Sequence, residues 1–218
     1  MNVFVLTTGR SGSLTFAEAC RHITNYSSGH ESRVGLVGAE RLAYPNDHIE
    51  IDNRLAWFPG RLAAAYGDDA FYVHLRRDES ATAASFVKRW NKPAMRAYRQ
   101  GILWDVDAGT DRMDLALDLV RTLNSNIELY LRDKSATMTI DIEEATAAFP
   151  DFWARIGAKG DLEAALAELS VKHHEGKTRR ATPRSNERPG STQPRDKQSK
   201  RGRRQGRAWS LSRLLPRR

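Results

Sequence analysis

Short apolar runs recur along the first two thirds of the chain and predict buried strands. Three of these runs stop abruptly at polar residues, as fully buried parallel strands do: residues 2–7, 70–75 and 137–142. A weaker strand candidate, residues 48–51, mixes polar and apolar side chains. Helical periodicity separates the runs, so the pattern predicts crossover connections and an α/β fold with a parallel sheet.

The segments between the expected strands keep their apolar residues three or four positions apart, which is the helical period. The clearest helix is residues 111–131, whose apolar stripe consists of Met113, Leu117, Val120, Leu123, Ile127 and Leu131. Shorter helices are expected at residues 12–23, 79–90, 149–156 and 161–169. Asp161 is the expected N-cap of the last one, because aspartate accepts bonds from the free N–H groups of a first turn.

Charge is distributed unevenly along the 218 residues, whose formal net charge is +8. Residues 170–218 hold 16 of the 35 Lys and Arg but only three of the 27 Asp and Glu, which gives +13 there and −5 for residues 1–169. Because residues 172–208 have almost no aliphatic side chains, they cannot bury enough surface to offset the entropy of ordering. We therefore expect a folded domain at residues 1–170 and a basic, disordered tail at residues 171–218.

Several classes of protein are disfavoured by composition. With 40% hydrophobic residues the chain can build one globular domain, but no apolar run approaches the roughly 20 residues of a membrane-spanning helix. No basic segment precedes the first apolar run, so a signal peptide is not expected. Cys20 is the only cysteine, which excludes an internal disulfide and indicates a reducing, cytoplasmic setting.

The loop after the first strand has the composition of an anion-binding turn. Ligands of open α/β sheets bind at the carboxyl ends of strands, where Gly9 and Gly12 permit a tight turn and close backbone approach. The N–H groups at the start of the following helix would point at a ligand, and Arg10 adds a permanent cation. The residues expected to bind the anion are Gly9, Arg10, Ser11, Gly12, Ser13 and Leu14.

The same loop departs from the pattern of nucleotide hydrolases. A Walker A loop continues its last glycine with Lys and then Ser or Thr, which bind the terminal phosphates and magnesium. Here Ser13 and Leu14 follow Gly12, and the cation, Arg10, precedes it. We therefore expect a phosphate-like group to bind without a metal, which disfavours a kinase-like phosphotransferase.

Two motifs together resemble the sulfotransferases that use 3′-phosphoadenosine-5′-phosphosulfate (PAPS). The loop resembles their 5′-phosphosulfate loop, and Arg77 with Ser85 eight residues later, directly after the strand at 70–75, resembles their 3′-phosphate motif R-[DN]-P-x-x-x-x-x-S. Glu79 stands where that family commonly has Pro, a position that mainly shapes the turn. The resemblance covers about residues 1–170 and implies a three-layer P-loop-like fold, with a central parallel sheet flanked by helices.

The resemblance also implies roles for individual residues. Arg77 and Ser85 would bind the 3′-phosphate, and Arg10 would stabilise charge at the transferring sulfuryl group. Because arginine does not release a proton in practice, the role of Arg10 would be electrostatic only. Some members of the family take their general base from the region after the first helix, which makes Glu31 the first candidate and His30 the second.

Other candidates stay open from the sequence. Glu50 and Asp52 alternate along a strand candidate and therefore share a face, so either could serve as the base or bind a polar acceptor. Trp57, Trp90 and Trp104 favour packing over an acceptor or adenine pocket. The histidines show no ligand-like arrangement with acidic partners, so no metal site is expected.

These observations predict a PAPS-dependent sulfotransferase that acts on a hydroxyl of a carbohydrate, lipid or other small acceptor. The alternative is a protein that binds nucleic acid or an anionic surface through its Arg-rich tail, residues 171–218. Even in the enzyme, the tail's charge predicts weak contact with nucleic acid or anionic membranes. The sequence does not predict an oligomeric state.

Overall fold

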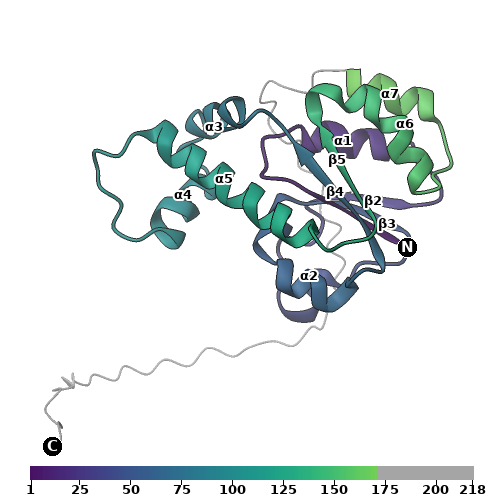
Figure 1. Cartoon of the computed structure of the whole chain (residues 1–218), viewed down its shortest axis with the longest axis horizontal. Coiled ribbons are helices and arrows are strands. Elements are labelled where there is room, and N and C mark those ends of the chain that lie inside the picture. Colours follow the sequence, from purple (N-terminus) through teal and green to yellow (C-terminus); the bar gives the residue numbers. More distant parts are fainter. Residues whose placement is uncertain (171–218) are drawn as a thin grey trace, which may run out of the picture. The chain divides into compact units, whose positions relative to one another are not determined.

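The computed structural model of the chain describes residues 1–170, and the predicted tail at 171–218 lies outside the described residues. A parallel sheet of five strands, in the order β2-β3-β1-β4-β5, forms the centre of the fold (Figure 1). Its strands are β1 Asn2–Leu6, β2 Ser27–His30, β3 His48–Ile51, β4 Ala70–Arg76 and β5 Thr137–Asp141. The expected α/β class with a parallel sheet is confirmed.

Helices cover both faces of this sheet and complete a three-layer arrangement (Figure 1). On one face lie α1 Ser13–Cys20, α6 Ala145–Arg155 and α7 Leu162–Ser170. On the other lie α2 Pro59–Tyr66, α3 Glu79–Val87, α4 Pro93–Ala97 and α5 Arg112–Leu131. Short turns of 3-10 or π type are η1 Gly38–Leu42, η2 Asn53–Trp57, η3 Tyr98–Ile102 and η4 Ile142–Glu144.

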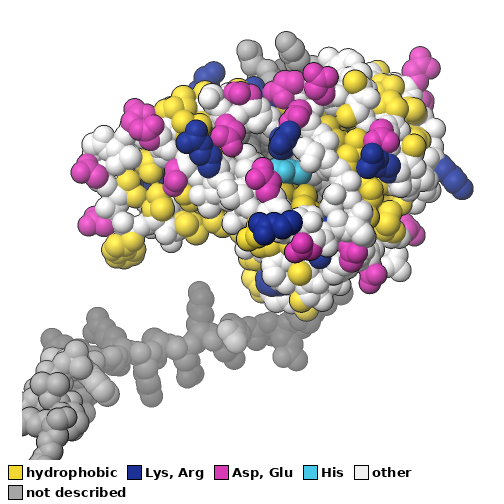
Figure 2. Space-filling view, viewed as in Figure 1, with side chains coloured by type: hydrophobic (Ala, Val, Ile, Leu, Met, Phe, Trp, Pro, Cys, Tyr) yellow, Lys and Arg dark blue, Asp and Glu magenta, His cyan; other side chains and the backbone are white. Residues whose placement is uncertain are grey.

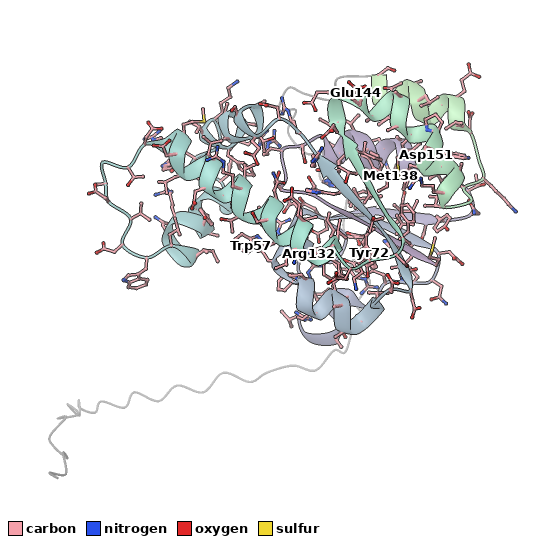
Figure 3. The ribbon with its side chains drawn as sticks, in the orientation of Figure 1. Trp57, Tyr72, Arg132, Met138, Glu144 and Asp151 are labelled. Atoms are coloured by element: carbon pink, nitrogen blue, oxygen red, sulfur yellow. The ribbon has the colours of Figure 1, made fainter. Side chains whose placement is uncertain are left out.

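The central strand β1 explains why its sequence is apolar at every position. Val3 and Val5 pack into the core beneath α1, whereas Phe4 and Leu6 pack into the core beneath α5. All four side chains are buried because successive residues of a strand point to opposite faces and both faces are covered. Trp57 packs against the core beneath α5 and lies on the α5 side of the sheet (Figure 3).

The strands predicted from apolar runs are found with nearly the predicted bounds, and the largest omission is β2. Its sequence, Ser27-Ser-Gly-His30, has no apolar residue, since β2 is an edge strand that is only partly buried. The helices α2 and α4 were also not predicted, and α3 ends at Val87, three residues before the expected end. Asp161 accepts a bond from the N–H of Ala164 at 2.9 Å, as expected of an N-cap.

Parallel pairing collects the ends of all five strands at one edge of the sheet. The register pairs His30 with Ile51, Val5 with Ile51, and Arg76 with Asp141. The chain winds from β1 toward β2 and β3 on one side and reaches β4 and β5 on the other, so the loop after β1 lies where the winding reverses. Ligands of such sheets bind at this reversal.

No helix in the described part of the chain is long and apolar enough to cross a membrane. The cytoplasmic setting stays a prediction.

Candidate functional site

The loop between β1 and α1 has an unusual backbone. Gly9, Arg10 and Gly12 have φ angles of 81°, 63° and 77°, all in the left-handed region. A Cβ at Gly9 would lie 3.1 Å from Asn53 Nδ2, and one at Gly12 would collide with the side chain of Ile142. Both positions therefore require glycine. A left-handed arginine is rare, and such strained residues gather at functional sites.

The start of α1 leaves backbone donors without a side-chain cap. Its N-cap is Gly12, which has no side chain to accept a bond from the first turn. The hydroxyls of Thr7 and Ser11 are buried and hydrogen-bonded to each other, so Ser11 would contribute its backbone rather than its hydroxyl. Leu14 is 47% exposed and would likewise contribute its N–H. An uncapped helix start and its dipole favour an anion.

The second predicted motif lies directly against this loop. Nε of Arg10 donates a hydrogen bond to Oγ of Ser85 on α3 at 3.0 Å. Nη1 of Arg77, just after β4, donates to the backbone carbonyl of Arg10 at 3.1 Å. Two sequence-distant motifs are thereby joined by two direct bonds into one site.

The site is electropositive. The pKa of Arg10 is lowered because partial burial disfavours its charge and because Arg89 and Arg77 add repulsion. Arg77 lies near Glu143, whose Oε1 is 3.8 Å from its Nε. The positive charge of the cluster is therefore only partly neutralised by carboxylates among the described residues.

The two candidate bases lie at the end of β2, His30 as its last residue and Glu31 directly after it, but they face different partners. Nε2 of His30 lies 3.1 Å from Oγ of Ser13 at the start of α1, so His30 touches the loop. Glu31 accepts a bond from Nδ2 of Asn53 at 2.8 Å and pairs with Nη1 of Arg54 at 2.9 Å. Both residues are half-buried at the carboxyl edge of the sheet.

The structure corrects the expectation for Glu50 and Asp52. Both carboxylates are fully buried, which leaves neither accessible to an acceptor. Glu50 accepts bonds from the N–H and hydroxyl of Ser32 at 2.7 and 2.6 Å, and lies 3.0 Å from Nε2 of His48. Asp52 pairs with Arg41, itself only 3% exposed, and accepts a bond from the N–H of Arg54 at 2.8 Å. They are structural groups that order the chain around β3.

The packing prediction is correct for two of the three tryptophans. Trp57 and Trp90 pack against the core beneath α5, and the guanidiniums of Arg99 and Arg112 lie 5.0 and 5.2 Å from the Trp90 ring centroid. For Trp104 the prediction is wrong, because its side chain is 90% exposed. The sequence did not predict this exposure, because Trp104 lies in the long connection between α4 and α5, whose path depends on the tertiary fold.

Several residues around the site were not predicted from the sequence. Asn53 and Ile142 contact the glycines of the loop, and Glu143 contacts Arg77. Each follows a strand closely, so the rule that parallel strands end together could have identified them. Arg89 lies four residues after Ser85, which is helical spacing and was also available from the sequence.

Within residues 1–170, no three His, Cys, Asp or Glu side chains form a group that could hold a metal ion. Metal-independent binding stays a prediction for the ligand complex.

Comparison with known proteins supports the fold. The sequence matches no family model and no curated protein. A solved structure of mouse sulfotransferase SULT7A1 complexed with PAP is similar, with a TM-score of 0.51 and 14% sequence identity over 78% of this chain. The similarity spans 63% of the length of that mouse protein chain. The chain therefore has a sulfotransferase-like fold, as the resemblance of its motifs implied.

Proposed function

We propose that this protein is a sulfotransferase that moves a sulfuryl group from PAPS to a hydroxyl of an acceptor. The observation that supports this most directly is the pair of hydrogen bonds that join Arg10 to Ser85 and Arg77 to Arg10. The donor has two anionic ends, and the two predicted halves of its site are adjacent here. If Arg10 and Arg77 were ordinary surface arginines, the two predicted motifs would have no reason to be bonded to each other.

The residues present suit such a donor. The left-handed glycines let the loop backbone approach a phosphate, and the uncapped start of α1 offers N–H donors to it. Ser85 and Arg77 supply a hydroxyl and a guanidinium for a second phosphate, and a guanidinium makes charge-assisted hydrogen bonds to a phosphate. The loop would therefore bind the 5′-phosphosulfate, and Arg77 with Ser85 the 3′-phosphate.

Catalysis would divide between charge stabilisation and proton removal. PAPS supplies the sulfuryl group, whose bond to the 5′-phosphate breaks as a bond to the acceptor oxygen forms. Arg10 would stabilise the negative charge that develops on the leaving phosphate, without exchanging a proton. His30 or Glu31 would accept the proton of the acceptor hydroxyl.

Binding and transfer test the proposal separately. We expect calorimetry to detect 3′-phosphoadenosine 5′-phosphate binding that is unchanged by EDTA, and labelled PAPS to transfer its label to hydroxyl-bearing molecules of an extract. The exposed Lys88→Gln variant controls for a nonspecific charge effect. Absence of nucleotide binding would overturn the proposal, and binding that EDTA abolishes would favour a metal-dependent phosphotransferase.

A further inference from the structure

Three arginines from separate segments lie close enough to interact at the site: Arg77 bonds to the Arg10 carbonyl, and both Arg77 and Arg89 repel the Arg10 guanidinium. Arg10 belongs to the loop, Arg77 follows β4, and Arg89 follows α3. The N–H of Arg89 donates to the carbonyl of Phe86 at 2.8 Å, so the helical turn continues past the end of α3. Residues four apart on a helical turn share a face, which puts Arg89 on the side of α3 that carries Ser85. After burial itself, repulsion from Arg89 is the largest cause of the lowered pKa of Arg10, ahead of repulsion from Arg77.

Arg10 and Arg89 have no counter-ion in the part of the chain that the structure describes. No carboxylate there lies within 4.0 Å of either guanidinium, and the side chain of Arg89 makes no hydrogen bond or ring contact. Many other arginines of the domain have an acidic partner, as in the pairs Arg21–Glu18, Arg41–Asp52, Arg76–Asp141, Arg121–Glu79 and Arg155–Asp151. On the face in Figure 2, basic and acidic side chains are interspersed in the same way.

An unneutralised cluster of this kind opposes folding, since like charges repel and partial burial removes hydration. Arg10 and Arg89 are both half-buried. The cluster becomes favourable when a multiply charged anion lies among the guanidiniums. A phosphate monoester, with a charge approaching −2 at neutral pH, is such an anion.

We propose that Arg89 is a third phosphate-binding arginine, which acts with Ser85 and Arg77 on the 3′-phosphate of the nucleotide. The inference rests on the proposed function and extends it to a residue outside both motifs. Arg89 follows the helix that carries Ser85, so it serves the 3′-phosphate rather than the 5′-phosphosulfate. Its contribution is selectivity for nucleotides that bear a 3′-phosphate.

Matched variants and two nucleotides test this role by calorimetry. We expect Arg89→Gln to weaken binding of 3′-phosphoadenosine 5′-phosphate about tenfold or more, the usual effect of losing a charged hydrogen-bond partner. Binding of adenosine 5′-monophosphate, which has no 3′-phosphate, should change less than twofold. Lys88→Gln removes the same charge one residue earlier from an exposed side chain and should leave both affinities unchanged.

The outcomes separate this inference from the proposed function. If the parent protein binds 3′-phosphoadenosine 5′-phosphate and Arg89→Gln binds it equally well, the role of Arg89 is wrong while the function stands. Equal weakening for both nucleotides would overturn the 3′-phosphate assignment. A parent protein that binds neither would overturn the function itself. Circular dichroism checks folding, and Arg89→Lys, which keeps the charge, should retain part of the selectivity and replaces Arg89→Gln if that variant unfolds.

Discussion

Nε of Arg10 lies 3.0 Å from Oγ of Ser85, and this hydrogen bond spans 75 residues of sequence. It brings a loop residue and a helix residue, each predicted to bind a different phosphate of one nucleotide, into direct contact. The contact implies that the two halves of the site are coupled. Substitution of Arg10 should therefore also affect binding at Ser85, and the reverse, although Arg10 is expected to act in transfer and Ser85 in nucleotide binding.

Arg77→Ala should weaken binding of 3′-phosphoadenosine 5′-phosphate by ten- to over a hundredfold. It removes a charged partner of the 3′-phosphate, an effect typically of about 1.5–3 kcal/mol, and it also removes the bond that fixes the Arg10 carbonyl. Ser85→Ala should have a milder effect of the same kind. Calorimetry measures both, with Arg121→Ala as the control because Arg121 pairs with Glu79 on the surface. Parent-like affinity in Arg77→Ala would refute the assignment.

Arg10→Ala should lower the turnover number more than it weakens binding of the desulfated product. The charge of Arg10 matters most as negative charge develops on the leaving phosphate, so its loss falls mainly on the transition state. Steady-state kinetics and calorimetry on one preparation compare the two effects. Arg10→Lys should recover part of the turnover, since it restores the charge. A variant that loses affinity and turnover equally would make Arg10 a binding residue only.

Separate substitutions of His30 and Glu31 should identify the base. Loss of the true base lowers turnover by about a hundredfold or more and leaves nucleotide affinity nearly unchanged. Glu31→Gln keeps the shape that Asn53 contacts but removes the charge that pairs with Arg54, and His30→Gln keeps a polar group near Ser13. Turnover in both variants within a few fold of the parent would exclude both candidates.

The fold was predictable where local pattern and burial agree. The apolar runs that form β1, β4 and β5 stop at polar residues. The apolar face of α5 follows its N-cap Asp111 and includes the predicted Val120, Leu123 and Ile127, which are buried. The edge strand β2 was not predictable, because an edge position needs no apolar side chains and its pairing with β3 depends on the tertiary fold.

The sequence motifs identified the residues of the candidate site but not the contacts between them. Gly9, Gly12, Arg77 and Ser85 were selected by type and spacing, but the bond between Arg10 and Ser85 depends on how β4 lies beside β1. The same limit explains the error for Glu50. Alternation correctly put it on one face of a strand, yet its carboxylate is buried against Ser32 and His48 and is not open to an acceptor.

The buried His74 should make folding sensitive to mildly acidic pH. It lies on β4 beneath α5, where burial lowers its pKa to about 4, from an ordinary value near 6.5. Below pH 6.5 the unfolded chain therefore binds a proton that the folded chain does not, so stability falls as the pH falls toward 4. Between pH 7 and 5 this one group should remove about 2 kcal/mol from the free energy of unfolding.

Urea unfolding of the parent and of His74→Gln at both pH values measures the contribution of His74. The variant should lose about 2 kcal/mol less than the parent on acidification. Lys88→Gln, a substitution of an exposed side chain elsewhere in the domain, is the control for a nonspecific effect of mutation on unfolding. Identical pH dependence in the parent and His74→Gln would show that His74 takes up its proton at the same pH in the folded protein as in the unfolded chain.

Gly12→Ala should destabilise the domain through backbone strain and through overpacking. The same substitution at Gly38 separates the two effects. A side chain at φ 77° is strained, and its Cβ would also collide with Ile142. Gly38 has a similar φ of 59°, but a Cβ there meets nothing within 4 Å, so Gly38→Ala reports the backbone strain alone, about 1–2 kcal/mol. Overpacking adds about 1–3 kcal/mol at Gly12.

Introducing Gly12→Ala into an Ile142→Ala background should remove the overpacking part and leave the strain. Urea unfolding of the single and double variants gives this coupling, which should be of the size of the overpacking effect. The double variant should still bind 3′-phosphoadenosine 5′-phosphate more weakly than Ile142→Ala, because a methyl group on Gly12 lies where the loop backbone must approach a phosphate. If Gly12→Ala is no less stable than Gly38→Ala, the packing of Ile142 on the loop is not as close as described, and η4 has no part in shaping the loop.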